Sequence, residues 1–293
     1  MAIIGRLSAP IAHAVVSFKA GNSFLMHLQI KTPSTVLLAV LVSSSITAQW
    51  LNQPDPRIPR TKDGKPDLTA KAPRAPDGNP DLSGVWIRRE GESTPAGSND
   101  KGLAFSLSWF MPKNAEIPLR PAAAAIFRER AARNGGGRPS EHCLPHGIPG
   151  AMLPPDPFKI VQTPGLTLIL YEAFVDFRQI FTDGRKHPKS TNPAWYGYSV
   201  GKWIGESFEV ETVGFNDESW LDGLGLPHSE ELRVTERFQR LTAGHLQMEG
   251  TIDDPKMYTR PWTFKVDFNA IPDADLIENI CENEKDLAHQ VAK

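Results

Sequence analysis

Alternating hydrophobic and polar residues run through much of the second half of the chain. The pattern is clearest over 262–268, where Trp, Phe, Val and Phe alternate with Thr, Lys and Asp. Since successive side chains of a strand point to opposite faces, this alternation predicts strands with one buried face. With turn signals between the segments, it predicts about ten short strands. They span 83–87, 158–162, 166–172, 177–182, 196–203, 208–213, 232–240, 245–252, 260–268 and 275–282.

The order of the strands predicts a mainly β fold. Short strands joined by tight turns form an antiparallel meander, and closing or nearly closing it into a barrel removes its exposed edges. A two-sheet sandwich is the alternative. One helix is predicted over 121–133, because Pro121 suits a first helical position and three glycines at 135–137 stop the helix. We expect this helix to pack outside the barrel.

The first 48 residues have the pattern of a secretory signal region. A short cationic start at Met26 leads to an apolar run over 36–42, then to small and polar residues that end at Ala48. This order is typical of a signal peptide, and the run is shorter than the roughly 20 residues that span a bilayer. An uncleaved anchor is the alternative. We predict translation from Met26, cleavage before Gln49, and a periplasmic or extracellular protein.

Three further parts follow the signal region. Residues 49–82 are rich in proline and repeat the phrase Asp-Gly-x-Pro-Asp-Leu at 63–68 and 77–82. Because Asp-Gly and x-Pro steps favour turns and extended chain, this segment is predicted to be an extended leader. The barrel domain is predicted over 83–286, with a tail at 287–293.

The composition argues against nucleic-acid and integral membrane partners. The 293 residues are 23% charged with a formal net charge of −2, so no basic excess would attract nucleic acid or an anionic membrane surface. The predicted partner is a small-molecule ligand or substrate.

The chain has two cysteines, Cys143 and Cys281. In an oxidising compartment an even count favours a disulfide, here closing a loop of 138 positions. Two free thiols are the alternative. The sequence His142-Cys-Leu-Pro-His146 does not predict a metal site, because Pro145 prevents a helix that would align both histidines. We predict neither a metal nor a cofactor.

Several phrases together carry a resemblance to a known group of proteins. The chain resembles a family of uncharacterised exported β-rich proteins of acidobacteria and some proteobacteria, which implies a secreted β domain and no particular activity. Gly84-Val-Trp86 on the first strand is also similar to the Gly-x-Trp of lipocalins and favours a lipocalin-like barrel over a sandwich. The family phrases are Asp-Gly-Asn-Pro-Asp-Leu-Ser-Gly-Val-Trp at 77–86 and the segments 157–165, 178–185, 197–203, 209–217 and 281–284.

The long connection 215–228 is the first candidate site. A connection of this length in a compact domain is usually functional or disordered, and its Trp and Leu residues argue against disorder. A packed surface loop is the alternative. His228 is the candidate acid or base, because Glu230 and Glu231 follow it. The other candidates in the loop are Asp217 and Asp222 as catalytic carboxylates and Trp220 as a ligand contact.

A buried charge pair is the second candidate. By two-residue periodicity Glu236 lies on the apolar face of its strand, and Arg178 shares a face with Ile180. Because burying either charge alone is costly, we predict that the two side chains pair inside the barrel. The pair is equally consistent with a site and with a purely structural role. Further candidate ligand contacts are Tyr171, Asp183 and His187.

Two functions remain open. The first is a secreted enzyme, of hydrolase, lyase or isomerase type, that acts on a small organic molecule or sugar at His228, Glu236 and Arg178. The second is a non-catalytic, lipocalin-like protein that binds an apolar or glycosidic ligand. The charged candidates favour the enzyme slightly. Convergence of these side chains at one barrel mouth would support catalysis.

Overall fold

The computed structural model describes residues 54–89, 106–190 and 192–281. The predicted signal region, its cleavage position and the tail at 287–293 lie outside these residues. Among the described residues, no helix is both long enough and apolar enough to cross a membrane.

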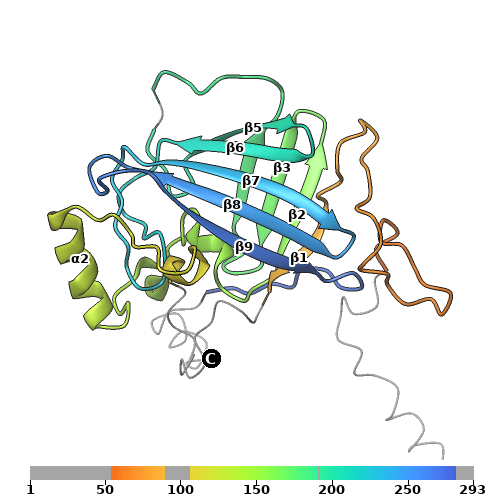
Figure 1. Cartoon of the computed structure of the whole chain (residues 1–293), viewed down its shortest axis with the longest axis horizontal. Helices are drawn as coiled ribbons and strands as arrows, with labels where there is room; N and C mark the ends of the chain where they lie inside the picture. The colour runs from red at the N-terminus through yellow and green to blue at the C-terminus, as the bar shows by residue number, and fades with distance from the viewer. Residues whose placement is uncertain (1–53, 90–105, 191, 282–293) are drawn as a thin grey trace, which may run out of the picture. The chain divides into compact units, whose positions relative to one another are not determined.

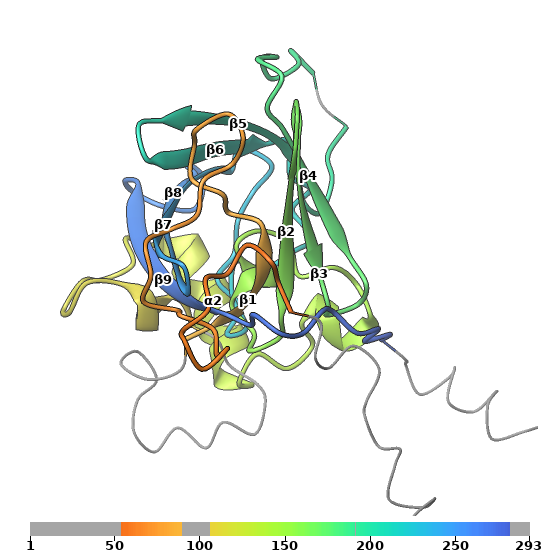
Figure 2. The same ribbon diagram turned by 90° about the vertical axis from the view of Figure 1, so that its right-hand side faces the viewer.

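Nine strands form a closed barrel in which each strand pairs with its neighbours in the chain, and β1 pairs with β9 (Figure 1). The mainly β, lipocalin-like barrel with one helix is therefore confirmed. Figure 2 shows β2–β4 crossing β5 and β6 steeply within the barrel wall. The strands are β1 Gly84–Arg88, β2 Phe158–Thr163, β3 Leu166–Tyr171, β4 Phe177–Phe181, β5 Tyr198–Ile204, β6 Ser207–Val213, β7 Arg233–Thr242, β8 His245–Asp253 and β9 Trp262–Ala270.

Two details of the strand prediction are wrong. The segment 275–281 forms no strand, and Asn279 makes only an isolated bridge with Ala173. The pairing of β1 with β9 already closes the barrel, so no edge is left for a tenth strand. In addition, β4 and β5 are parallel rather than antiparallel. The connection 182–197 returns the chain to the end where β4 began, and only Ile180 and Phe181 pair with β5.

Close-packed side chains occupy the interior of the barrel. Alternation along each strand turns one set of residues inward, as in β9, where Trp262, Phe264, Val266 and Phe268 are buried. Two inward glycines leave room for aromatic rings. A Cβ added at Gly250 would overlap the ring of Phe264. At Gly201 it would lie 2.6 Å from the ring of Phe208. These contacts show a core packed by its own side chains.

The leader covers one end of the barrel. The repeated phrase folds into two similar turns, each closed by a bridge, between Arg60 and Pro66 and between Arg74 and Pro80. Between them, the carbonyl of Leu68 accepts a hydrogen bond of 2.9 Å from the Gly244 amide in the β7–β8 turn. The segment 54–82 therefore folds against the barrel as a set of tight turns.

At the same end, Trp86 of the Gly-x-Trp phrase is fully buried, with the guanidinium of Arg240 4.8 Å from its ring centroid.

The opposite end of the barrel collects the remaining irregular segments. The strand directions place 138–157, which leads into β2, at the same end as the connections 172–176, 214–232 and 254–261. The helix α2, Pro121–Ala132, lies outside the barrel as predicted (Figure 1). Short 3-10 helices span η1 Leu107–Phe110, η2 Pro139–His142 and η3 Gly150–Met152.

Candidate functional site

A cleft of about 350 Å³ opens among these irregular segments. Its lining comes from 138–156, the β3–β4 connection, the 215–228 loop and the C-terminal segment around Asn279. Leu153, Phe174, Trp220 and several prolines make its walls largely apolar. Its polar groups include Arg138, Ser140, His146, Asp156 and Asp222.

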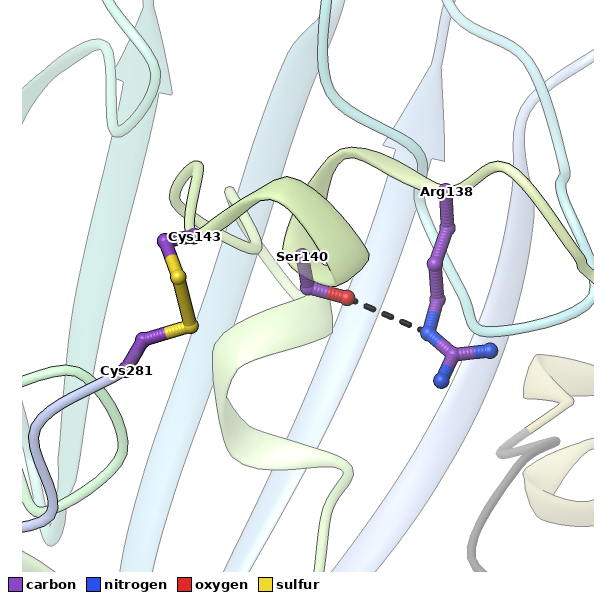
Figure 3. The surroundings of a disulfide bond; sticks show 4 residues. All are labelled: Arg138, Ser140, Cys143 and Cys281. Atoms are coloured by element: carbon purple, nitrogen blue, oxygen red, sulfur yellow. Dashed lines mark hydrogen bonds between the residues drawn. A yellow bond between two sulfur atoms is a disulfide. The ribbon is translucent and has the colours of Figure 1, made fainter. Parts of the chain in front are cut away.

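A disulfide joins two of the walls (Figure 3). Cys143 and Cys281 are bonded, with Cα atoms 5.4 Å apart, which confirms the predicted pair. Cys143 follows η2 in the left-handed region (φ 58°), and Cys281 follows the segment that carries Asn279. The Asn279 carbonyl accepts a 2.9 Å hydrogen bond from the Phe174 amide. Arg138, at the start of η2, donates to the Ser140 hydroxyl at 3.2 Å.

His146 lies in the cleft wall as a neutral ring. It stacks on Phe174 with ring centroids 4.8 Å apart and makes no hydrogen bond with any described residue. Burial and, to a smaller extent, the positive charge of Arg138 lower the pKa of His146 to about 4. At neutral pH its ring nitrogens therefore offer the cleft one donor and one acceptor.

Two carboxyl groups also line the cleft, in different environments. Asp156 has neither a hydrogen bond nor an ion pair with the described residues, and burial raises its pKa. Asp222 is almost completely buried. Burial raises the pKa of Asp222, opposed by hydrogen bonds of 2.9–3.2 Å from four backbone amides, those of Leu107, Leu224, Gly225 and Leu226. Asp222 therefore shapes the loop, whereas Asp156 is available to a ligand.

The predicted loop 215–228 contributes Trp220 and Asp222 to the cleft. Arg130 of α2 packs against the Trp220 ring, with its guanidinium carbon 4.4 Å from the ring centroid. Asp217 is exposed and does not line the cleft. The contacts of Trp220 and Asp222 therefore help to hold the loop in place.

His228 is buried and does not line the cleft. Its Nδ1 donates to the Ser229 carbonyl at 3.2 Å, so its Nε2 accepts from the Ser219 hydroxyl at 2.7 Å. Burial lowers the pKa of His228. Among the described residues it makes no hydrogen bond to Asp217, Asp222 or Arg178, so the predicted convergence around His228 does not occur.

The predicted pair of Arg178 and Glu236 is confirmed. The guanidinium donates to both carboxylate oxygens, at 3.1 and 2.5 Å, and both side chains are inaccessible to solvent. Arg178 also donates to the hydroxyls of Ser199 and Thr212, at 3.0 and 2.7 Å. Burial acts to lower the pKa of Arg178, but the charge of Glu236 raises it overall. The pair lies inside the packed barrel and not in the cleft.

The remaining predicted ligand contacts lie elsewhere. Tyr171 is buried in the barrel and stacks on Tyr196 at 5.7 Å, and burial raises its pKa. Asp183 is exposed beyond the far end of β4 and forms a 2.6 Å ion pair with Arg185. His187 is partly buried and hydrogen-bonds the Glu211 carbonyl at 3.0 Å. None of these three lines the cleft.

Sequence reasoning did not select His146 or Asp156 as ligand-facing groups. Both lie in irregular chain, where no periodicity reports burial. The signal in the sequence was their setting, because the segment 139–157 after the helix combines six prolines with two histidines and one aspartate. Rigid proline-rich chain is a suitable frame for a cleft, because it loses little conformational entropy on folding.

No family model, curated protein or solved structure matches the chain. Within the described residues, no group of three or more His, Cys, Asp or Glu side chains is arranged to hold a metal ion. The cleft is therefore the feature from which a function can be inferred.

The partly buried His146 leads to a pH prediction. Because the folded-state pKa of His146 is about 4 and an unfolded histidine titrates near 6.5, acid favours the unfolded state. Its contribution to stability is complete above pH 6.5 and is lost as the pH falls towards 4, by about 3 kcal/mol at most. Urea unfolding of the wild type and His146→Phe at several pH values measures this loss.

The variant should lose less stability than the wild type between pH 6.5 and 4. Some acid sensitivity remains, because burial also lowers the pKa of His228. The exposed His142 supplies the matched control, and His142→Phe should behave as wild type. Equal acid sensitivity of His146→Phe and wild type would contradict the prediction.

Proposed function

We propose that this protein is an exported small-molecule-binding protein whose ligand occupies the cleft at the end of the barrel. The observation that carries the proposal is the cleft of about 350 Å³, with largely apolar walls and with His146 and Asp156, whose polar groups pair with no other described residue. Ligand sites commonly have this size, with mostly apolar walls and a few convergent polar groups. The barrel interior is a poorer candidate for the ligand site than the cleft, because its own side chains fill it.

The disulfide and the pattern of the first 48 residues support export. The phrases at 77–86 and beyond support membership of the family of exported bacterial proteins that the chain resembles. Neither observation restricts the ligand, which must be inferred from the cleft.

Catalysis is the second candidate function, and His146 with Asp156 favours it, since displaced pKa values in a cleft often mark catalytic groups. Binding remains the better supported function. A base whose pKa is about 4 is weak at neutral pH. Arg178 and Glu236 are committed to each other inside the barrel.

The proposal predicts that blocking the cleft abolishes binding. We expect compounds from a panel of small organic molecules and sugars to raise the melting temperature of the mature protein, because they bind the folded state only. Replacing the exposed Asn279 by tryptophan should fill the cleft and weaken those hits at least about tenfold, as measured by calorimetry.

The control is Asp183→Asn, which alters an exposed side chain beyond the far end of β4 and should leave the affinity unchanged. Hits that bind Asn279→Trp as well as wild type would place the ligand elsewhere. Turnover of a hit by the wild type, lost in Asn279→Trp, would instead favour the enzyme.

A further inference from the structure

The charges around the cleft indicate what kind of ligand it takes. We infer that the cleft binds an organic amine, with its ammonium group at Asp156 and its apolar body against Phe174 and Trp220. This inference rests on the proposed binding function and adds the ligand class.

Asp156 is the central observation. Its carboxyl group lines the cleft, is partly buried and has no hydrogen-bonding or ionic partner among the described residues. A partly buried carboxylate without a partner is unfavourable, and an ammonium group supplies both the opposite charge and hydrogen-bond donors. The raised pKa of Asp156, due to burial alone, agrees with a carboxyl group that lacks a partner.

The other charged groups of the cleft do not compensate Asp156. Arg138 forms a 3.2 Å ion pair with Glu141 and donates to Ser140. His146 is neutral at pH 7. Asp222 adds a second carboxyl group, held by backbone amides rather than by a cation. Among the side chains that line the cleft, two carboxyl groups therefore accompany one guanidinium group, which favours a cation and disfavours a carboxylate ligand.

The aromatic walls support the same ligand class. Ammonium groups are attracted to the faces of Trp and Phe rings, and Trp220 already carries the guanidinium of Arg130 on one face. Phe174 is held in place by stacking on His146. Leu153 and the prolines of the cleft provide apolar contacts for the ligand body.

Matched compounds that differ only in the polar group test the inference. We would titrate the mature protein at pH 7.5 with amines, alcohols and carboxylates that share phenylethyl, indolylethyl or cyclohexylethyl bodies. At least one amine should bind about tenfold or more tightly than its alcohol, the effect of one charge-assisted interaction, and the carboxylate should bind most weakly.

Asp156→Asn should reduce the affinity for the amine to that for the alcohol, and it should leave the affinity for the alcohol unchanged. Glu278→Gln is the matched control, because it removes one exposed carboxylate beside Asn279 without altering the cleft lining. Equal binding of amine and alcohol, an Asp156→Asn variant that keeps its amine preference, or failure of every amine to bind would overturn the inference. Binding of other compounds that Asn279→Trp blocks would still support the proposed function.

Discussion

Replacing Arg178 with methionine is expected to lower the free energy of unfolding by about 3–5 kcal/mol. The substitution leaves the Glu236 carboxylate, which has no exposed surface, without its bidentate partner. Ser199 and Thr212 lose their donor as well, although their hydroxyls lie 2.9 Å apart and can still pair with each other. Equilibrium unfolding in urea measures the change.

Two variants separate the cost of an orphaned charge from loss of packing. The double variant Arg178→Met/Glu236→Leu should recover most of the stability, because it removes both charges together. Arg185→Met removes an exposed ion pair and should cost less than about 1 kcal/mol. If the single and double variants were equally unstable, packing rather than charge would explain the loss.

Removing the disulfide is expected to cost about 2–5 kcal/mol, because Cys143 and Cys281 are 138 positions apart and the bond restricts the unfolded chain. The Cys143→Ser/Cys281→Ser variant, measured by urea unfolding, should match the reduced wild type. A reductant should have no further effect on the variant. A wild type whose stability is insensitive to full reduction would contradict the prediction.

The same variant should bind its ligand more weakly than wild type. No described residue of 271–281 is fully buried, and Asn279 lines the cleft from this segment. Its first residues are fixed by the Arg60–Asp273 ion pair and by backbone hydrogen bonds with Val85 and Asp55. Over 275–281 the contacts besides the disulfide are the Lys159–Asp275 ion pair and two hydrogen bonds from backbone amides, one to the Asn279 carbonyl and one to Glu172. Segments with few buried contacts open readily. Without the disulfide, the segment around Asn279 should therefore move away from the cleft more often, and the cleft should bind its ligand less tightly.

The amino-acid sequence alone was sufficient to predict those elements and contacts that have a local pattern or a physical requirement in the sequence. A two-residue period reports burial directly, so nine of the strand segments and the helix after Pro121 were predictable. The Arg178–Glu236 pair was predictable for a different reason. A charge on an apolar face needs a partner, and only two such residues stood out. The disulfide was predictable because the number of cysteines is even and the predicted compartment is oxidising.

Tertiary structure decided where the cleft lies. The sequence suggested His228 and the 215–228 loop, but His228 satisfies both ring nitrogens within buried chain. The cleft instead forms where chain segments far apart in sequence meet, including those of His146, Asp156, Trp220 and Asn279. Their convergence depends on barrel closure, strand direction and the disulfide. These long-range relations leave no periodic trace in irregular chain, so only the folded structure could show that Asp156 lines the cleft without a partner among the described residues.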